Sequence, residues 1–239
     1  MSVGVGFRVF TEVNRPNRTL VERFAGIPTS NINDMMGRMY NTNGSIHPMN
    51  EQPLLGTAFT VKAPVGDNMV FHRALDLAQP GDVIVVDGGG CCDRSLAGEI
   101  MMTYAAARGI AGIVVDGALR DAGALRRCPM PIYCKAITPQ GPYKHGPGEI
   151  NVPVCCGGVA VLPGDIVVGD ADGLVFIRPE DAEYVLEKAL KKAAAEAKKL
   201  AAYHTAGIDE DEHRSSYEKQ LADAGAVILE GDFRSLLKR

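Results

Sequence analysis

The chain has 239 residues, of which 46% are hydrophobic, and it carries a formal net charge of −4 at pH 7. This length suits one large domain with or without an appendage, and the slight acidity gives no basic footprint for nucleic acid. Apolar runs end well short of the ~18 residues that a bilayer span needs, and the opening residues lack the pattern of a secretory signal. We therefore expect a cytoplasmic protein that contacts neither nucleic acid nor membrane.

The first predicted elements are a helix over 33–40, with Asn33 as its N-cap, and a strand over 54–63. A helix over 68–78 follows, and it carries Asn68 and His72 four residues apart, which places both on one face. The pair could position a ligand. A histidine in an amphipathic helix, however, more often contacts only the protein itself.

The middle of the chain alternates strands with helices. The stretches QPGDVIVVDGGG at 79–90 and LPGDIVVGDADG at 162–173 each combine a tight turn, an apolar β-branched run, and an aspartate with glycines, which predicts a strand. GIAGIVVDG at 109–117 has the continuous apolar centre of a strand covered on both faces. A helix over 98–109 ends at a glycine, and a last strand is predicted over 173–179.

The remaining segments complete an α/β domain with a helical tail. The run 138–154 is rich in proline and glycine, so we expect an ordered crossing loop or the rim of a site. A long, charged, alanine-rich helix is predicted over 178–207, followed by an acidic stretch and a short helix. This pattern predicts a catalytic domain over 1–178 and a helical extension over 179–239.

The six cysteines show no C-x-x-C spacing and no zinc-like pattern, so we expect free thiols that act as small buried or half-buried apolar side chains. They are Cys91, Cys92, Cys128, Cys134, Cys155 and Cys156. A dinucleotide fingerprint that began at Gly88 would need a glycine where Asp93 stands, which argues against that motif.

One stretch, GEIMMTYAAARGIAGIVVDGALRD at 98–121, predicts a site. Gly98 precedes a helix whose first turn offers free N–H groups and the positive end of the helix dipole, which suit a small carboxylate. The next strand delivers Arg120 and Asp121 at its carboxyl end, where functional groups of parallel sheets gather. If strands 83–87 and 110–116 are neighbours, Glu99, Arg120 and Asp121 share one sheet edge.

These residue types suit an α-keto acid. Arg120 offers a planar fork for a carboxylate, and Asp121 supplies a hard oxygen ligand of the kind that Mg²⁺ or Mn²⁺ prefers. A metal on the keto oxygen would stabilise an enolate and permit cleavage of the C–C bond beyond it. Two plainer interpretations stay open: a solvated Arg–Asp turn, and Glu99 as a simple capping residue. A Schiff base on Lys62 or Lys135 is a further alternative.

Several stretches can be compared with known families: HRALDLAQPGDVIVVDGGG…LAGEI…RGIAGIVVDGALRD…GPGEINVPVCCGGVAVLPGD…DGLVFI. Over about residues 25–185, the chain resembles the RraA-like family. It is most similar to the 4-hydroxy-4-methyl-2-oxoglutarate / 4-carboxy-4-hydroxy-2-oxoadipate aldolase branch. Enzymatic members share an acidic residue, twenty intervening residues and Arg-Asp; Glu99, residues 100–119 and Arg120-Asp121 match, with glutamate where many members carry aspartate.

The resemblance implies an αββα sandwich like the swivelling phosphohistidine domains, assembled as homotrimers or homohexamers. It implies a metal-dependent pyruvate aldolase with oxaloacetate decarboxylase side activity, in which Asp121 holds Mg²⁺ or Mn²⁺. Arg120 would bind the pyruvate moiety, Glu99 would help to hold a metal-bound water, and Asn68 and His72 would lie near the distal carbon. The main-chain amides would come from Gly98, Glu99, Ile100 and Met101.

Two implications concern other proteins or other copies of this chain. Glu196 in the long C-terminal helix could reach the site of a neighbouring subunit, although surface glutamates are routine in alanine-rich helices. The alternative function is that of the family's namesake, a regulatory protein that binds and inhibits ribonuclease E without catalysis. The intact acid–Arg–Asp set and the C-terminal helix favour the enzyme.

Overall fold

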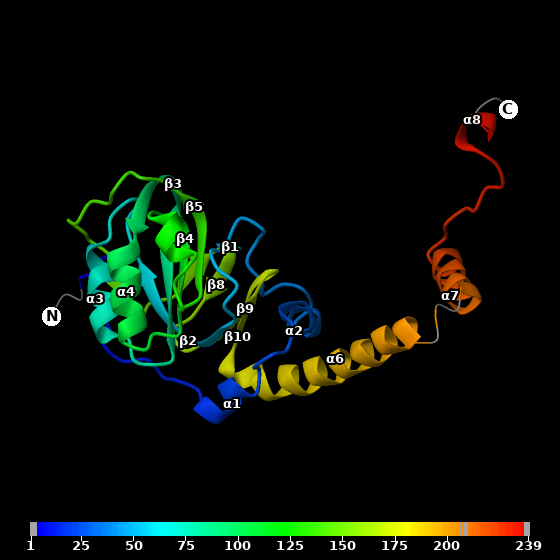
Figure 1. The fold of residues 1–239 in the computed structure, drawn as a ribbon, viewed down its shortest axis with the longest axis horizontal. Helices are drawn as coiled ribbons and strands as arrows, with labels where there is room; N and C mark the ends of the chain where they lie inside the picture. The colour runs from blue at the N-terminus through cyan, green and yellow to red at the C-terminus, as the bar shows by residue number, and fades with distance from the viewer. Residues whose placement is uncertain (1–3, 206, 208–209, 237–239) are drawn as a thin grey trace. The chain divides into compact units, whose positions relative to one another are not determined.

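The computed structural model describes residues 4–205, 207 and 210–236 (Figure 1). Its main sheet has the strand order β1-β5-β4-β3-β2-β9-β10, with β6 paired to β2, while β7 and β8 form a separate hairpin. The strands are β1 (His47–Pro48), β2 (Leu54–Lys62), β3 (Asp82–Ala97), β4 (Gly112–Leu119), β5 (Ile132–Ile137), β6 (Glu149–Ile150), β7 (Val154–Cys156), β8 (Val159–Val161), β9 (Ile166–Asp170) and β10 (Gly173–Ile177). The helices are α1 (Arg18–Glu22), α2 (Thr29–Met35), α3 (Met69–Leu77), α4 (Glu99–Ala107), α5 (Ala122–Leu125), η1 (Pro179–Asp181), α6 (Ala182–Thr205), α7 (Glu210–Asp223) and α8 (Phe233–Leu236).

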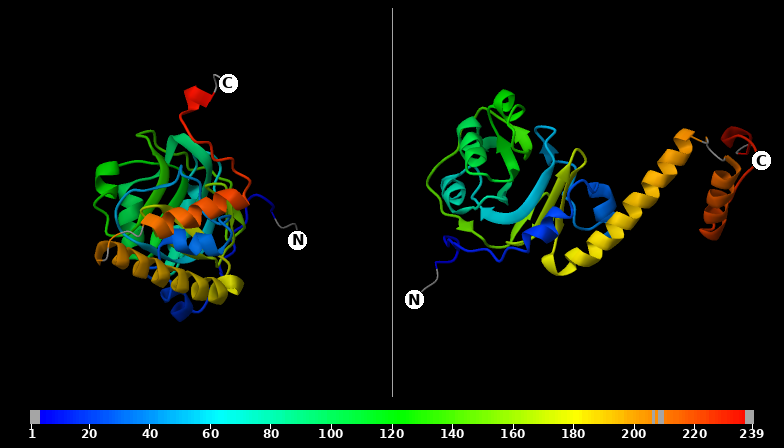
Figure 2. Two further views of the ribbon diagram at one scale, coloured as in Figure 1. Left: turned by 90° about the vertical axis from the view of Figure 1, so that its right-hand side faces the viewer. Right: turned by 60° about the horizontal axis from the view of Figure 1, so that its bottom comes forward.

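Strands β2, β3, β4 and β5 run parallel and are covered on both faces. Along β3, Ile84 and Val86 point into a core shared with α3 and α4, whereas Val83 and Val85 point into a second core on the other face. This alternation is the two-residue period of a strand. The turned views show α3 and α4 side by side against the sheet (Figure 2).

The antiparallel pair β9–β10 continues the main sheet beyond β2 and lies on the other side of the second core. Val167 and Phe176 join the same second core as Val83, while Ile166 and Ile177 face a third core that is completed by α1, α2 and the start of α6. The three cores therefore separate four layers in the order α, β, β, α. The mixed α/β fold with C-terminal helices that the sequence predicted is confirmed.

Most predicted elements are observed within a few residues of their expected bounds, but the helix expected over 33–40 is wrong. Helix α2 begins at Thr29, directly after Pro28. The carboxylate of Asp170 accepts bonds from the N–H and the hydroxyl of Thr29, so β9 fixes the start of this helix. Such a long-range contact has no local signal in the sequence.

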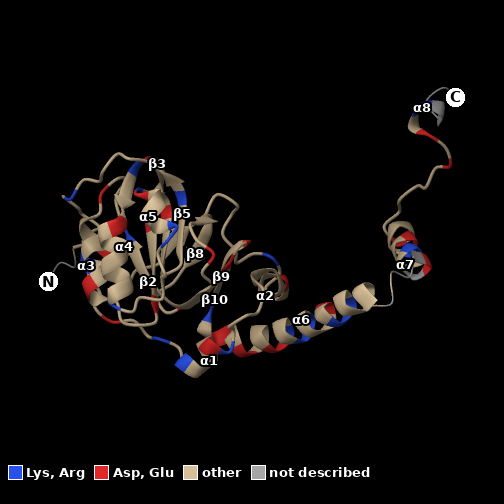
Figure 3. Ribbon diagram, in the orientation of Figure 1, with Lys and Arg blue, Asp and Glu red and all other residues tan. Residues whose placement is uncertain are grey.

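The described residues up to Ala193 form one compact unit, and those from Ala194 onward form a second. Ala182, Val185, Leu186 and Ala189 of α6 pack in the third core, so the first turns of this helix belong to the first unit. Lysine and glutamate side chains both lie along α6, as expected for a largely exposed helix (Figure 3). The predicted division into a catalytic domain over 1–178 and a helical extension over 179–239 stays a prediction. Among the described helices, none has both the length and the apolar character needed to cross a bilayer.

Candidate active site

The parallel pairing of β3 with β4 brings the two halves of the predicted site together. Ala97 lies opposite Leu119 at the carboxyl ends of these strands, and the N–H of Arg120 donates to the carbonyl of Ala97 at 3.0 Å. The chain then enters α4 after Gly98 and α5 after Asp121. The expected neighbouring strands are confirmed, and both helix starts lie at one sheet edge.

Asp121 caps a helix other than its own. Its Oδ2 accepts a 2.9 Å hydrogen bond from the N–H of Glu99, the first residue of α4, and its side chain makes no cap bond to α5. The backbone of Asp121 is left-handed, with φ at 61°, a conformation that aspartate tolerates better than most residues. A carboxylate at this position also complements the dipole of α4.

Gly98 permits this close approach. A Cβ atom at this position would lie 2.2 Å from Oδ2 of Asp121 and 2.8 Å from Cγ of Arg120. Its own φ of −153° is extended backbone that any residue can adopt, so lack of space alone demands a glycine here. The glycine thus sets how closely the Arg–Asp pair lies to the start of α4.

A pocket with a cavity volume of about 150 Å³ collects the predicted substrate residues except Glu99. Its lining consists of Asn68, His72, Ala97, Gly98, Ile100, Met101, Arg120, Asp121, Pro142 and Lys144. The guanidinium of Arg120 lies 3.7 Å from the Asp121 carboxylate, and both side chains are a little over 40% exposed (44% and 43%). Among the described residues, the N–H groups of Ile100 and Met101 have no acceptor. These amides and Arg120 are therefore free to bind an anion.

Lys144 and Pro142 also line the pocket, although they belong to none of the predicted catalytic motifs. They belong to the proline- and glycine-rich run 138–154, which the sequence indicated as an ordered loop or the rim of a site. This composition was the sequence signal that could have identified them. Burial first, and then the positive charge of Lys144, lower the pKa of His72 below its ordinary value of 6.5, against an opposing effect of Asp76. His72 is therefore a neutral imidazole near pH 7, and Lys144 is the second cation of the pocket after Arg120.

Asn68 anchors the pocket wall. Its Nδ2 donates to the carbonyl of Leu96 at 2.7 Å, which ties the start of α3 to β3. Its Oδ1 is buried and has no hydrogen-bond partner among the described residues. The amide is 2% exposed, so its fixed orientation shapes the pocket.

The side chain of Glu99 does not line this pocket. It lines an adjoining hollow between α4 and α5, together with Met102, Thr103 and Arg127. Its N–H is already bonded to Asp121, so this amide is not free for a substrate. Glu196 lies in the second unit, and its expected role in a neighbouring subunit's site stays a prediction.

The lysines and cysteines weighed as alternatives lie outside the pocket. Lys62 pairs with Asp87 at 3.1 Å, and Lys135 lies 3.6 Å from Asp116. All six cysteines are free; burial raises the pKa of the Cys134 thiol to about 11, and the pKa of Cys156 is also raised by burial. The expectation of buried or half-buried thiols is wrong for Cys92 and Cys155, which are exposed.

The donors present fit a hard divalent cation that keeps most of its water. Among the described residues, no group of three or more His, Cys, Asp or Glu side chains converges on one point. Asp121 offers one carboxylate, with Oδ2 fixed by Glu99 N–H and Oδ1 without a bond inside the described chain. Mg²⁺ is often held by one or two carboxylates plus substrate and water, so this donor set suits it.

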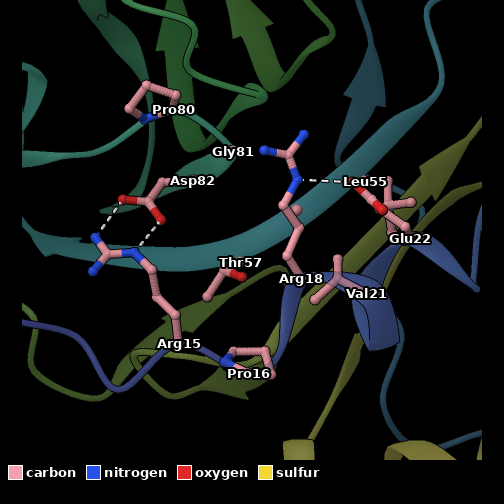
Figure 4. Close-up of a pocket in the computed structure, with 11 residues that line it drawn as sticks. Arg15, Pro16, Arg18, Val21, Glu22, Leu55, Thr57, Pro80, Gly81 and Asp82 are labelled. Carbon is pink, nitrogen blue, oxygen red and sulfur yellow. Dashed lines mark hydrogen bonds and ion pairs between the residues drawn. The ribbon is translucent and has the colours of Figure 1, made fainter.

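A second hollow, of about 320 Å³, lies at the amino ends of β2 and β3 (Figure 4). Arg15 donates to both oxygens of Asp82, at 2.8 and 2.7 Å, and Arg18 donates to Glu22 at 2.7 Å. The charges in this hollow are matched in pairs. It therefore offers a structural clamp rather than a place for a charged substrate.

The RraA-like family model, described as Aldolase/RraA, matches residues 29–176. A Halalkalibacterium halodurans protein, provisionally named as a 4-hydroxy-4-methyl-2-oxoglutarate aldolase, is 45% identical over 73% of this chain and 83% of its own length. The 4-hydroxy-4-methyl-2-oxoglutarate aldolase of Thermus thermophilus is 40% identical over 46% of this chain and 68% of its own.

Solved structures give the same assignment. A Streptomyces coelicolor protein, described as an unusual member of the RNase ES inhibitor RraA protein family, superposes with a TM-score of 0.69 at 29% identity, covering 78% of this chain and 99% of its own. With the family model matched over most of the first unit, the chain belongs to the RraA-like family.

Proposed function

We propose that this protein is a divalent-metal-dependent pyruvate aldolase. It would cleave 4-hydroxy-2-oxo acids that carry a second carboxylate, such as 4-hydroxy-4-methyl-2-oxoglutarate or 4-carboxy-4-hydroxy-2-oxoadipate, to pyruvate and a second keto acid. The observation that carries the proposal is the meeting of Arg120, Asp121 and the start of α4 in one pocket. The names of the relatives support the same chemistry.

The pyruvyl end of the substrate would bind at Arg120. The guanidinium presents a planar fork to the carboxylate, and the unbonded N–H groups of Ile100 and Met101 lie at the positive end of α4. Gly98 keeps these groups close together. This half of the pocket would be common to every substrate that yields pyruvate.

The distal end would face Lys144. This ammonium group has no ion-pair partner among the described residues, and it lies near enough to His72 to lower its pKa. A pocket lined by Lys144 as well as Arg120 favours a substrate with two carboxylates over a simple keto acid. This feature supports a dicarboxylate substrate class.

Asp121 would hold the metal through its free carboxylate oxygen, with water and substrate as the other donors. When bound, Mg²⁺ or Mn²⁺ would stabilise the negative charge that develops on the 2-oxo oxygen. The hydrogen bond to Glu99 N–H fixes the carboxylate before substrate arrives, so little reorganisation is needed.

Bond cleavage requires two proton transfers. A base takes the proton of the 4-hydroxyl, the C3–C4 bond breaks, and its electron pair forms the enolate of pyruvate, which then gains a proton at C3. The neutral imidazole of His72 is suited to accept the hydroxyl proton. Glu99 would act through a bridging water, because its side chain lines the adjoining hollow. Oxaloacetate would lose CO₂ through the same enolate, which gives the side activity.

A lactate dehydrogenase-coupled assay tests the proposal. Pyruvate should appear from 4-hydroxy-4-methyl-2-oxoglutarate with Mg²⁺ or Mn²⁺, and EDTA should abolish its release until metal is restored. Turnover that is unchanged in EDTA would contradict metal dependence. Pyruvate from oxaloacetate alone would retain the enolate chemistry and reject the substrate.

The similarity to RNase ES inhibitor relatives favours one second candidate, a regulatory protein that binds a ribonuclease. A pull-down with ribonuclease E, performed on the preparation used for the pyruvate assay, separates the two functions. Mass in solution would test the expected homotrimer or homohexamer in the same preparation.

A further inference from the structure

The loop that carries Lys144 is held by a buried acid. Asp67 is 4% exposed, and its Oδ2 accepts bonds from the N–H groups of His145 at 2.6 Å and Gly146 at 3.0 Å. These are the two amides that directly follow Lys144. Bonds from several N–H groups to one carboxylate are charge-assisted and order a loop strongly.

The same carboxylate also fixes the start of α3, which carries other residues of the pocket. Its Oδ1 accepts a 2.9 Å bond from the N–H of Met69, the first residue of α3, the helix that carries His72. Two backbone bonds reinforce the junction: Asn68 N–H to the Tyr143 carbonyl at 3.0 Å, and Tyr143 N–H to the Gly66 carbonyl at 2.8 Å. One side chain thus connects a helix and a loop that both line the pocket.

The loop has a separate clamp at its other end. Arg94 donates to the carbonyl of Gly141 at 2.6 Å and lies 4.1 Å from the ring centroid of Tyr143. Ser95 donates through its N–H and its hydroxyl to the carbonyl of Gln140. These contacts hold the segment beside Arg120, since a Cβ at Gly141 would lie 3.1 Å from Arg120 Nη1. Among the described residues, Asp67 is the side chain that bonds the amides next to Lys144.

The charge of Asp67 is maintained by its partners. Burial raises the pKa of this carboxyl, but the backbone N–H groups of His145, Met69 and Gly146 outweigh burial, and the pKa is lowered from its ordinary value. The carboxylate is therefore ionised at neutral pH. An asparagine in its place would lose the bond from at least one N–H donor, and its neutral oxygen would accept the remaining bonds without charge assistance, so the anchor of the loop is weakened.

We propose that Asp67 is a positioning residue that sets the affinity for the distal end of the substrate by holding Lys144 at the pocket that Arg120 also lines. This proposal rests on the proposed function, because it concerns a substrate with a second carboxylate. Asp67 does not line the pocket, so it acts through the loop and not by touching substrate.

Kinetics provide the first test. Asp67→Asn should raise KM for 4-hydroxy-4-methyl-2-oxoglutarate about 10-fold, with kcat nearly unchanged, because the bonds lost are charge-assisted but remote from the reacting atoms. The inhibition constant of pyruvate, which occupies only the Arg120 end, should not change. Lys144→Gln should give the same pattern. The double variant should have the same KM as Lys144→Gln, because both substitutions remove the same interaction with the substrate.

Trypsin provides a test that needs no activity. The bond it cleaves after Lys144 contains the N–H of His145 that Asp67 accepts, so Asp67→Asn should be cut there faster than the wild-type protein. Asp93→Asn is the matched control. This substitution removes the same charge, and the exposed side chain of Asp93 has no described contact. Control and wild type should be cleaved at equal rates.

Several outcomes would overturn the proposal. These are a weaker pyruvate inhibition in Asp67→Asn, additive effects in the double variant, or unchanged cleavage after Lys144. If Asp67→Asn does not fold, hydrogen exchange of the wild-type protein decides: unprotected amides at His145 and Gly146 would reject the anchor. A wild-type protein that releases no pyruvate would reject the proposed function instead, while trypsin still reports whether Asp67 holds the loop.

Discussion

The carboxylate of Asp121, at the end of β4, accepts the first N–H of α4 from Glu99 at 2.9 Å. This bond joins two residues that the sequence separates by a helix and a strand. The bond holds Oδ2 and thereby fixes the position of Oδ1, the second oxygen of the same carboxylate. It also stabilises the start of α4, whose following residues line the pocket. The Arg–Asp turn is therefore more than a solvated surface feature.

Gly98→Ala should abolish most of the pyruvate release. The new Cβ would lie 2.2 Å from Asp121 Oδ2, so the Arg–Asp pair must move, and misplacement by about 1 Å can reduce a rate about 100-fold. The coupled assay measures this loss. Gly123→Ala is the control, because the nearest atom to its Cβ is Arg127 Nη1 at 3.8 Å. Comparable activity in both variants would contradict a requirement for space at Gly98.

Arg120→Lys should weaken pyruvate as an inhibitor about 10- to 100-fold, because a point charge replaces a two-pronged contact with the carboxylate. Asp121→Asn should instead shift the metal dependence, raising the Mg²⁺ concentration that gives half-maximal activity. Metal and pyruvate titrations of both variants separate these effects. If Asp121→Asn kept the wild-type metal dependence, the assignment of Asp121 to the metal would be wrong.

His72 should titrate below its ordinary pKa of 6.5 when followed by NMR, because burial and Lys144 both disfavour its charged form. Lys144→Gln should move this pKa upward, whereas Lys188→Gln on α6 should not. A lowered pKa means that the unfolded chain binds the proton more readily, so this group's contribution to stability is lost as pH falls through and below 6.5. Activity should decline over the same acidic range.

The Arg15–Asp82 clamp should matter for stability and not for catalysis. Asp82 is 1% exposed, and Arg15→Met would leave its buried charge with only the Gln79 N–H as a partner among the described residues, at a cost of about 3 kcal/mol in the free energy of unfolding. Urea denaturation measures this change. Arg18→Met is the control, since the Arg18–Glu22 pair is exposed and should contribute little. Equal losses in both variants would reject the clamp.

The sequence predicted most elements well, because strands and helices leave local signals, and the proposed roles of the site residues stay predictions. The apolar run of β3 and the Gly109 stop of α4 follow from strand and helix periodicity. Arg120 and Asp121 follow a buried parallel strand, which is where such sheets carry functional groups. The mismatch at α2 arose because Asp170, far along the chain, decides where that helix begins.

The sequence by itself determined the α/β alternation, the family resemblance and the helix that follows Gly98 as α4. Only the tertiary structure decided that Asp121 caps α4, that Glu99 turns away from the pocket, and that Lys144 joins it. The physical reason is the distance along the sequence over which each interaction acts. Periodicity and capping act over a few residues, whereas strand register and the hydrogen bonds of Asp67 bring together segments many residues apart.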